Sequence, residues 1–180
     1  MYLRPPRDGD WASWAELRGS SRAFLEPWEP AWPGDALTRS AYRRRLRQVL
    51  EEWDLDSAYG FHIFHRRAES LVGGITLSNV RRGASQSGTV GYWIGQIHAR
   101  KGHMTEALGC VADFAFGRLG LHRLEAACLP PNEASRRLLL KVGFVEEGYA
   151  EGYLRINGAW HDHVLFGMIE ERWSKLRPRH

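Results

Sequence analysis

The chain changes between two hydrophobic patterns, and each change marks the border of an expected element. Short runs of apolar, β-branched and aromatic residues predict strands at the start of the chain and over residues 59–64, 71–77, 89–94, 122–128, 144–156 and 160–169. Apolar residues that recur every three or four positions predict helices that begin near residue 8 and over residues 37–53, 104–119 and 132–143. Because strands and helices are interleaved without a repeat or low-complexity linker, we expect one mixed α+β domain.

Turn and cap residues sharpen these borders. We expect Asp8 or Asp10 to cap the first helix. Asn132 is placed to cap the last expected helix, and Gly143 is placed to end it. The dipeptide Asn157-Gly158 separates the last two strands and suits a tight hairpin turn.

Composition narrows the class of protein. With 180 residues, of which 43% are hydrophobic and 26% charged, the chain suits a single globular domain over residues 1–180, in which residues 10–53 form an N-terminal helical segment. No apolar run approaches the roughly 18 residues of a membrane span, and residues 1–6 lack the apolar stretch of a signal peptide, so we expect a cytoplasmic protein. Cys110 and Cys128 lie in apolar segments without metal-type spacing, so we expect both thiols to be buried and reduced.

The formal charge of +4 has three explanations: a nucleic-acid partner, an anionic cofactor or a solvated basic face. Arg43, Arg44, Arg45 and Arg47 fall between the apolar positions of the helix expected over residues 37–53. This spacing favours a solvated face, and direct nucleic-acid binding is not indicated.

The segment from Gly91 to Leu119 combines a strand, a glycine-containing loop and a helix. The first turn of a helix carries unpaired N–H groups and a positive dipole end, which favour a bound phosphate. Gly102 would let the backbone approach such a phosphate closely, and Arg100 and Lys101 add positive charge. The alternative is an ordinary strand-to-helix connection. A nucleotide P-loop is disfavoured because its spacing of glycines and lysine is absent.

These segments resemble a known family. The run from Gly91 to Gly95, followed by residues 99–107, resembles the acyl-coenzyme-A motif of GNAT N-acetyltransferases. Residues 132–144 resemble the second cofactor-contacting helix of that family and its following strand. Residues 22–30 and 78–83 resemble the members that acetylate the N-terminal alanine of a ribosomal protein.

The resemblance implies a mostly antiparallel mixed sheet with flanking helices and a V-shaped split between two parallel central strands. Acetyl-coenzyme A would enter this split, and no metal is implied. The strand edge at Tyr92, Trp93 and Ile94 would bind the pantetheine arm, and one strand amide would polarise the thioester carbonyl. The remaining expected cofactor contacts are Arg100, Lys101, Gly102, His103, Met104 and Thr105 for the pyrophosphate, and Asn132.

The catalytic acid and base are less clearly marked. Leu139 stands where many GNAT enzymes carry a tyrosine that protonates the leaving thiolate, and Ser135 is the best substitute by position. Its alternative role is a hydrogen bond within the helix. Glu151 and Asp162 are candidates for accepting the amine proton through water, although each can equally be a structural or exposed carboxylate.

His161 and His163 would share a face of a strand, as a metal pair does. A third ligand is missing, so we expect no metal at this position.

The proline-rich stretch over residues 24–33 cannot be a regular helix, and we expect an ordered aromatic loop on the acceptor side, within the segment of residues 10–53. Trp28 and Trp32 would cover the acetyl-transfer cleft, or alternatively close the hydrophobic core. Glu26 or Glu29 would face a positively charged peptide terminus, or alternatively lie exposed.

The expected reaction is direct acetyl transfer in a ternary complex, because neither cysteine has a histidine in its local motif to activate it. The expected acceptor is the α-amine of an N-terminal alanine of a ribosomal protein. The alternatives are a small amine as acceptor and a ribosome-associated binding protein that retains the fold.

Overall fold

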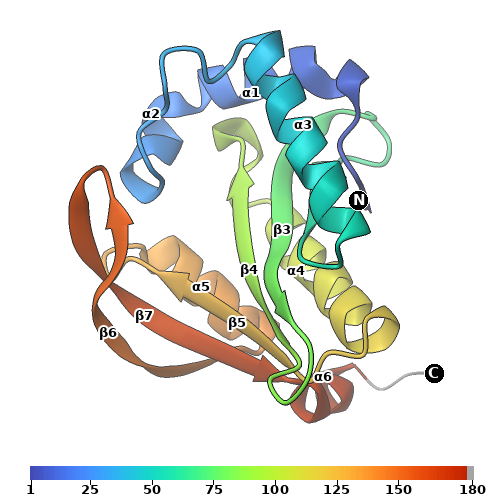
Figure 1. The fold of residues 1–180 in the computed structure, drawn as a ribbon, viewed down its shortest axis with the longest axis vertical. Helices are drawn as coiled ribbons and strands as arrows, with labels where there is room; N and C mark the ends of the chain where they lie inside the picture. Colours follow the sequence, from blue (N-terminus) through green and yellow to red (C-terminus); the bar gives the residue numbers. More distant parts are fainter. Residues whose placement is uncertain (178–180) are drawn as a thin grey trace.

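The structure is a computed structural model that describes residues 1–177. It contains one seven-stranded sheet in the order β1-β2-β3-β4-β5-β7-β6, shown in Figure 1. The strands are β1 (Tyr2–Arg4), β2 (Tyr59–Phe64), β3 (Leu71–Arg81), β4 (Ser87–Ile94), β5 (Arg123–Cys128), β6 (Val145–Ile156) and β7 (Ala159–Ile169). The α-helices are α1 (Trp11–Ser20), α2 (Arg22–Leu25), α3 (Arg39–Asp54), α4 (His103–Asp113), α5 (Glu133–Val142) and α6 (Glu170–Leu176). Shorter helical turns are η1 (Asp8–Asp10), η2 (Glu26–Trp28), η3 (Gln96–His98) and η4 (Phe114–Arg118).

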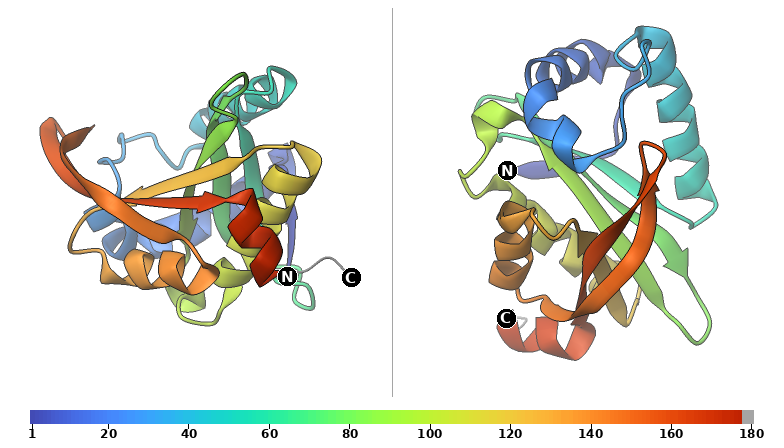
Figure 2. Two further views of the ribbon diagram at one scale, coloured as in Figure 1. Left: turned by 90° about the horizontal axis from the view of Figure 1, so that it is seen from below. Right: turned by 90° about the vertical axis from the view of Figure 1, so that its left-hand side faces the viewer.

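Helices cover both faces of the sheet, as the two views of Figure 2 show. The larger core lies between the sheet and helices α4 and α5, and it includes Leu108 and Leu139. A smaller core joins α1 and α3 to the opposite face, where Trp14 and Tyr42 pack against Trp93 of β4. We call the first face the α5 face and the second the α1 face.

The two central strands β4 and β5 pair in parallel over only a short stretch. The pairing joins Ser87 to Arg123, Gly88 to Leu124 and Thr89 to Glu125, and it stops there. All other strand pairs among the described residues are antiparallel. Beyond Thr89, β4 runs away from β5, which Figure 1 shows as a splay between the two arrows. The V-shaped split that the family resemblance implies is therefore present, and we call it the opening.

Several predicted borders need correction. Strand β3 extends to Arg81, beyond the predicted end at residue 77, because the polar residues after Leu77 keep pairing with β4 through an irregular step. The predicted helix over residues 104–119 is α-helical only to Asp113 and then widens into the π-turn η4. The stretch over residues 24–33 starts with helical turns through Trp28, because Pro27 is tolerated in the first turn of η2, and becomes non-helical afterwards.

The predicted cap of the first helix is wrong, whereas the caps of α5 are confirmed. Asp10 precedes α1 but makes no side-chain cap, because its carboxylate instead binds the guanidinium of Arg4 at 2.6 and 2.8 Å. Asn132 accepts a hydrogen bond from the Ser135 N–H at 3.1 Å, and Gly143 ends α5 with φ of 112°.

The burial of the two thiols was predicted correctly for only one of them. Cys128 is buried at the end of β5, whereas Cys110 lies on the exposed side of α4. In the described part of the chain, no helix has the length and apolar character that a membrane crossing requires.

Candidate active site

The edge of β4 presents free backbone donors to the opening. Along a strand, successive N–H groups point to opposite sides. The N–H of Gly95 bonds to the carbonyl of Val72 on β3 at 2.9 Å, so the N–H of Trp93 also points to β3. The N–H groups of Tyr92 and Ile94 therefore point toward β5, where β4 has no pairing partner. This edge can bind an extended amide-containing ligand as a further strand would.

Helix α4 begins beside this edge with unpaired donors. Its N-cap is Gly102, which has φ of 84° and no side chain to satisfy the first-turn N–H groups. His103, Met104 and Thr105 supply these N–H groups, although the Met104 side chain itself lies in the core. The preceding loop turns sharply at Arg100, which has φ of 61°. An anion at this position would meet both the free N–H groups and the positive end of the helix dipole.

Charged and protonatable side chains surround the start of α4. Arg100 and Lys101 are exposed, and neither forms an ion pair within residues 1–177. The imidazole of His103 lies 5.7 Å from that of His65 and 6.3 Å from that of His98, measured between ring centroids. Burial and the neighbouring positive groups lower the pKa of His98 and His103. Sequence reasoning missed both His98, which precedes α4 in the chain, and His65, which only folding brings beside α4 from the β2–β3 turn.

A hydrogen bond joins β4 to α5 beside the opening. The hydroxyls of Tyr92 and Ser135 lie 2.8 Å apart, and burial raises the pKa of Tyr92, which keeps its hydroxyl protonated. Asn132 uses its side-chain oxygen as the α5 cap, so its amide nitrogen remains the group that can donate to a ligand. Leu139 is fully buried in the core and does not reach the opening. Sequence reasoning identified the backbone of Tyr92 but missed its hydroxyl.

The two carboxylates considered as bases lie on the β6–β7 hairpin. Asp162 accepts hydrogen bonds from the Tyr149 hydroxyl at 2.6 Å and from the Gly152 N–H at 2.8 Å. These bonds stabilise the charged carboxylate and lower the pKa of Asp162, which weakens it as a proton acceptor. Glu151 is exposed on β6 and makes no side-chain hydrogen bond within the described residues.

The neighbouring histidines do not form a metal cluster. Among residues 1–177, no group of three or more His, Cys, Asp and Glu side chains is arranged to hold a metal ion. His163 is buried and uses Nδ1 to bond the His161 carbonyl at 3.0 Å.

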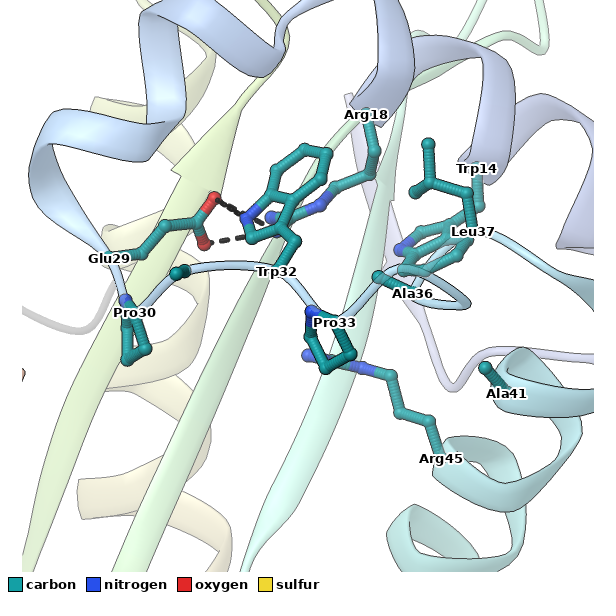
Figure 3. A pocket seen from close by; sticks show the side chains of 11 residues that line it. Trp14, Arg18, Glu29, Pro30, Trp32, Pro33, Ala36, Leu37, Ala41 and Arg45 are labelled. Carbon is teal, nitrogen blue, oxygen red and sulfur yellow. Dashed lines mark hydrogen bonds and ion pairs between the residues drawn. The ribbon is translucent and has the colours of Figure 1, made fainter. Parts of the chain in front are cut away.

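A buried arginine holds the loop expected on the acceptor side, and Figure 3 shows this Arg18 beside Glu29 and Trp32. The Arg18 guanidinium lies between the rings of Trp32 and Trp93, 4.4 and 4.9 Å from their centroids. Its Nη2 atom donates to both carboxylate oxygens of Glu29, at 2.9 and 3.0 Å. The Trp32 indole N–H donates to the same carboxylate at 3.0 Å. Glu29 is therefore neutralised within the chain, beside a cavity of about 340 Å³ whose lining includes Trp14, Arg18, Glu29 and Trp32.

The remaining acceptor-side residues lie nearer to solvent. Glu26 pairs with Arg22 at 2.6 Å on the surface, and Trp28 is 39% exposed. The loop also touches the hairpin turn, because the Ala31 N–H donates to the Asn157 side-chain oxygen at 2.5 Å. This contact joins the acceptor-side segment to the tip of the β6–β7 hairpin.

Comparisons with known proteins agree on one family. A family model described as an acetyltransferase (GNAT) domain matches residues 1–145. The chain is 36% identical over 169 residues to the probable N-acetyltransferase YjcK of Bacillus subtilis. The aligned residues make up 94% of this chain and 93% of YjcK. It is 34% identical over 177 residues to the ribosomal protein uS5-alanine N-acetyltransferase of Escherichia coli. The aligned residues make up 98% of this chain and 91% of that enzyme.

A solved structure supports the same assignment. RimJ of Mycobacterium smegmatis in complex with CoA-disulfide matches with a TM-score of 0.89 and 34% identity, over 98% of this chain and 83% of that one. Together with the split sheet, these matches show the fold, the cosubstrate and the reaction class. The chain belongs to the GNAT acetyltransferase family and is an acetyl-CoA-dependent N-acetyltransferase.

Proposed function

We propose that this acetyltransferase modifies the α-amine of a protein that begins with alanine, with a ribosomal protein as the expected acceptor. The observation that carries the proposal is the 34% identity to the uS5-alanine enzyme over 98% of this chain, which includes the acceptor-side residues as well as the cofactor motif. We also propose that residues 1–180 act as one catalytic unit in which residues 10–53 supply the acceptor side.

The groups around the opening fit acetyl-coenzyme A. Its thioester supplies an activated acetyl group. In this proposal, the N–H groups of Tyr92 and Ile94 bind the pantetheine arm and the thioester carbonyl. The free amides from His103 to Thr105, with Arg100 and Lys101, bind the pyrophosphate. The fit rests on this chain's unpaired donors, because Gly102 leaves the first turn of α4 without a side-chain cap.

Ser135 is the proposed hydrogen-bond donor to the leaving sulfur. Its backbone N–H is held by Asn132 and its hydroxyl by Tyr92, so the side chain is oriented from two directions. A Tyr92 hydroxyl that donates to Ser135 Oγ would strengthen the Ser135 O–H as a donor, because chained hydrogen bonds polarise one another. In this proposal, Ser135 and Tyr92 together take the role of the tyrosine that many GNAT enzymes carry at the position of Leu139.

The chemistry of the acceptor amine supports a chain terminus over a lysine side chain. An α-amine has an unperturbed pKa of about 8, about two units below that of a lysine amine. Asp162 is poorly suited to remove a proton from a strongly basic amine, since its carboxylate is already stabilised in the charged form. A weakly basic amine, which loses its proton more readily, is therefore the better acceptor at this site.

The test is an acceptor panel with purified protein and acetyl-coenzyme A, read by intact mass. The panel contains a ribosomal-protein peptide beginning with alanine, the same peptide with a blocked α-amine and an internal lysine, and a set of small amines. We expect one added acetyl group on the free peptide alone. Acetylation of the blocked peptide or of small amines, with none on the free terminus, would refute the proposed acceptor.

A further inference from the structure

One histidine on β7 has a free ring nitrogen at the position where the reaction needs a base. The even-numbered residues of the central strands, such as Tyr92, Cys128 and Val164, pack on the α5 face. Trp93 packs on the α1 face with the N-terminal helices. Because side chains alternate along a strand, His163 points to the α1 face, opposite to Ser135.

His163 also lies level with the reaction centre along the strands. The β4–β5 register pairs Thr89 with Glu125, and continuing both strands by three residues brings Tyr92 level with Cys128. Cys128 pairs with Val164 of β7. His163 precedes Val164 in the chain and lies one residue outside the part of β7 that pairs with β5. Ser135 bonds to Tyr92. The hydroxyl of Ser135 and the imidazole of His163 thus lie at one level of the sheet, on its two sides.

The hydrogen bonds of His163 fix its tautomer. A carbonyl oxygen only accepts hydrogen bonds, so the 3.0 Å contact with the His161 carbonyl requires a proton on Nδ1. Nε2 of the neutral ring then carries a lone pair, and it has no hydrogen-bond partner in residues 1–177. A buried histidine with one nitrogen oriented by a carbonyl and the other free is arranged as a proton acceptor.

We propose that His163 is the general base of this acetyltransferase and takes the proton of the acceptor amine on the α1 face. The inference rests on the proposed function for the placement of the thioester and of Ser135. It assigns to His163 the role of base that was first considered for Glu151 and Asp162.

In the proposed step, a nitrogen–carbon bond replaces the carbon–sulfur bond of the thioester. His163 Nε2 accepts one proton from the terminal ammonium, and the neutral amine nitrogen then bonds to the thioester carbon. The nitrogen loses its second proton to solvent as the carbon–sulfur bond breaks, while the Ser135 hydroxyl donates a hydrogen bond to the departing sulfur. The imidazolium returns its proton to solvent, and the released thiolate regains one from solvent. Acid and base on opposite sides of the opening let the amine enter from one face while sulfur is stabilised from the other.

The surroundings of His163 suit this role. The ring of Tyr153 from β6 lies 5.5 Å away, and the adjacent titratable groups are His161 and Asp162 on β7 and Glu151 on β6. A base of imidazole strength matches an α-amine better than a lysine amine, which agrees with the proposed acceptor.

The test compares wild type with His163→Asn, whose amide nitrogen keeps a donor near the Nδ1 position while Nε2 is removed. His163→Gln serves as a second variant should the Asn protein melt early, and His161→Gln is the matched control on the same face. The readouts are kcat/KM for the alanine peptide from pH 6 to 9.5 and the affinity for acetyl-coenzyme A by calorimetry. We expect His163→Asn to lose about 100-fold in kcat/KM at pH 7, within the usual range for general-base catalysis.

The loss in kcat/KM of His163→Asn should shrink to a few-fold at pH 9, because an amine with a pKa of about 8 is then already neutral. Affinity for acetyl-coenzyme A should stay unchanged, and His161→Gln should follow the wild-type profile. An equal loss at every pH, no loss, or the same loss in His161→Gln would overturn the proposal. If wild type leaves the peptide unmodified, the proposed acceptor fails instead, and the same variants on the amine that it does acetylate decide the role of His163.

Discussion

The two sides of the opening are built in opposite ways. On the proposed cofactor side, the edge of β4 and the start of α4 leave backbone donors without partners, and Gly102 adds no side chain to satisfy them. On the proposed acceptor side, Arg18 and Glu29 neutralise one another through Nη2, although the buried Nε of Arg18 has no hydrogen-bond partner in the described residues. The proposed cofactor side therefore offers free donors to an anion, whereas the charges of Arg18 and Glu29 on the proposed acceptor side neutralise one another. Selectivity for the acceptor must then come from shape and from proton transfer.

The largest effect is expected where the two sides meet, at Ser135. Ser135→Ala should lower kcat by about 100-fold, the lower end of the range for general acid catalysis, with little change in acetyl-coenzyme A affinity. Tyr92→Phe should lower kcat less, and the double variant should behave like Ser135→Ala, because Tyr92 acts through Ser135. Steady-state kinetics with calorimetry would check this, and additive losses would contradict the coupling.

The cofactor side should be most sensitive at Gly102. A β-branched residue is strained at φ of 84°, at a cost of order 1–3 kcal/mol, so Gly102→Val should weaken acetyl-coenzyme A binding by about 10- to 100-fold. Gly102→Asn should lose less, because asparagine tolerates this conformation. Gly148→Val is the control, since Gly148 lies on β6 with open space around its Cα and no positive φ. Equal calorimetric affinities for all four proteins would remove this loop from the cofactor site.

Removal of the buried Arg18 charge on the proposed acceptor side should lower the stability of the fold. Arg18→Ala leaves Glu29 without its guanidinium partner and opens space between Trp32 and Trp93, so the free energy of unfolding should fall by about 2 kcal/mol. Arg22→Ala, which removes an exposed ion pair with Glu26, should change it by less than about 1 kcal/mol. Chemical denaturation would measure both, and equal values would contradict an anchoring role for Arg18.

The smallest effect concerns the histidines at the start of α4. The pKa of His98 and His103 is lowered in the free protein, and a bound phosphate would raise it, so binding takes up protons. Affinity for acetyl-coenzyme A should therefore rise as the pH falls from 8 toward 6.5, by less than about tenfold per unit for each proton. Titrations at several pH values would check this sign. A His98→Ala, His103→Ala double variant should lose the dependence, and a dependence that survives would point to another group.

The sequence predicted the local geometry of the proposed cofactor side better than that of the proposed acceptor side, for a physical reason. The backbone donors of β4 and α4 follow from a strand, a glycine and a helix start that are contiguous in the chain. The α5 cap at Asn132 follows from local sequence in the same way. The pairing of Arg18 with Glu29 between two tryptophans, one of them on β4, depends on distant segments that only folding brings together.

The hairpin illustrates the same limit. Its turn at Asn157-Gly158 was predicted from the dipeptide, and both residues have the positive φ that such a turn needs. The role of its histidines was not predictable, because a shared strand face suggests a metal pair as readily as a base. The direction of the His163 ring became clear only from its bond to the His161 carbonyl and from the register with β5.

The central claim is that this acetyltransferase acts on a chain terminus. The most direct measurement uses one peptide that carries both a free N-terminal alanine and an internal lysine, so that the two amines compete in the same molecule. Wild-type protein with acetyl-coenzyme A is incubated with this peptide at pH 7, and tandem mass spectrometry locates the acetyl group. The account predicts acetyl on the alanine nitrogen and an unmodified lysine, and acetyl on the lysine with a free alanine terminus would contradict it.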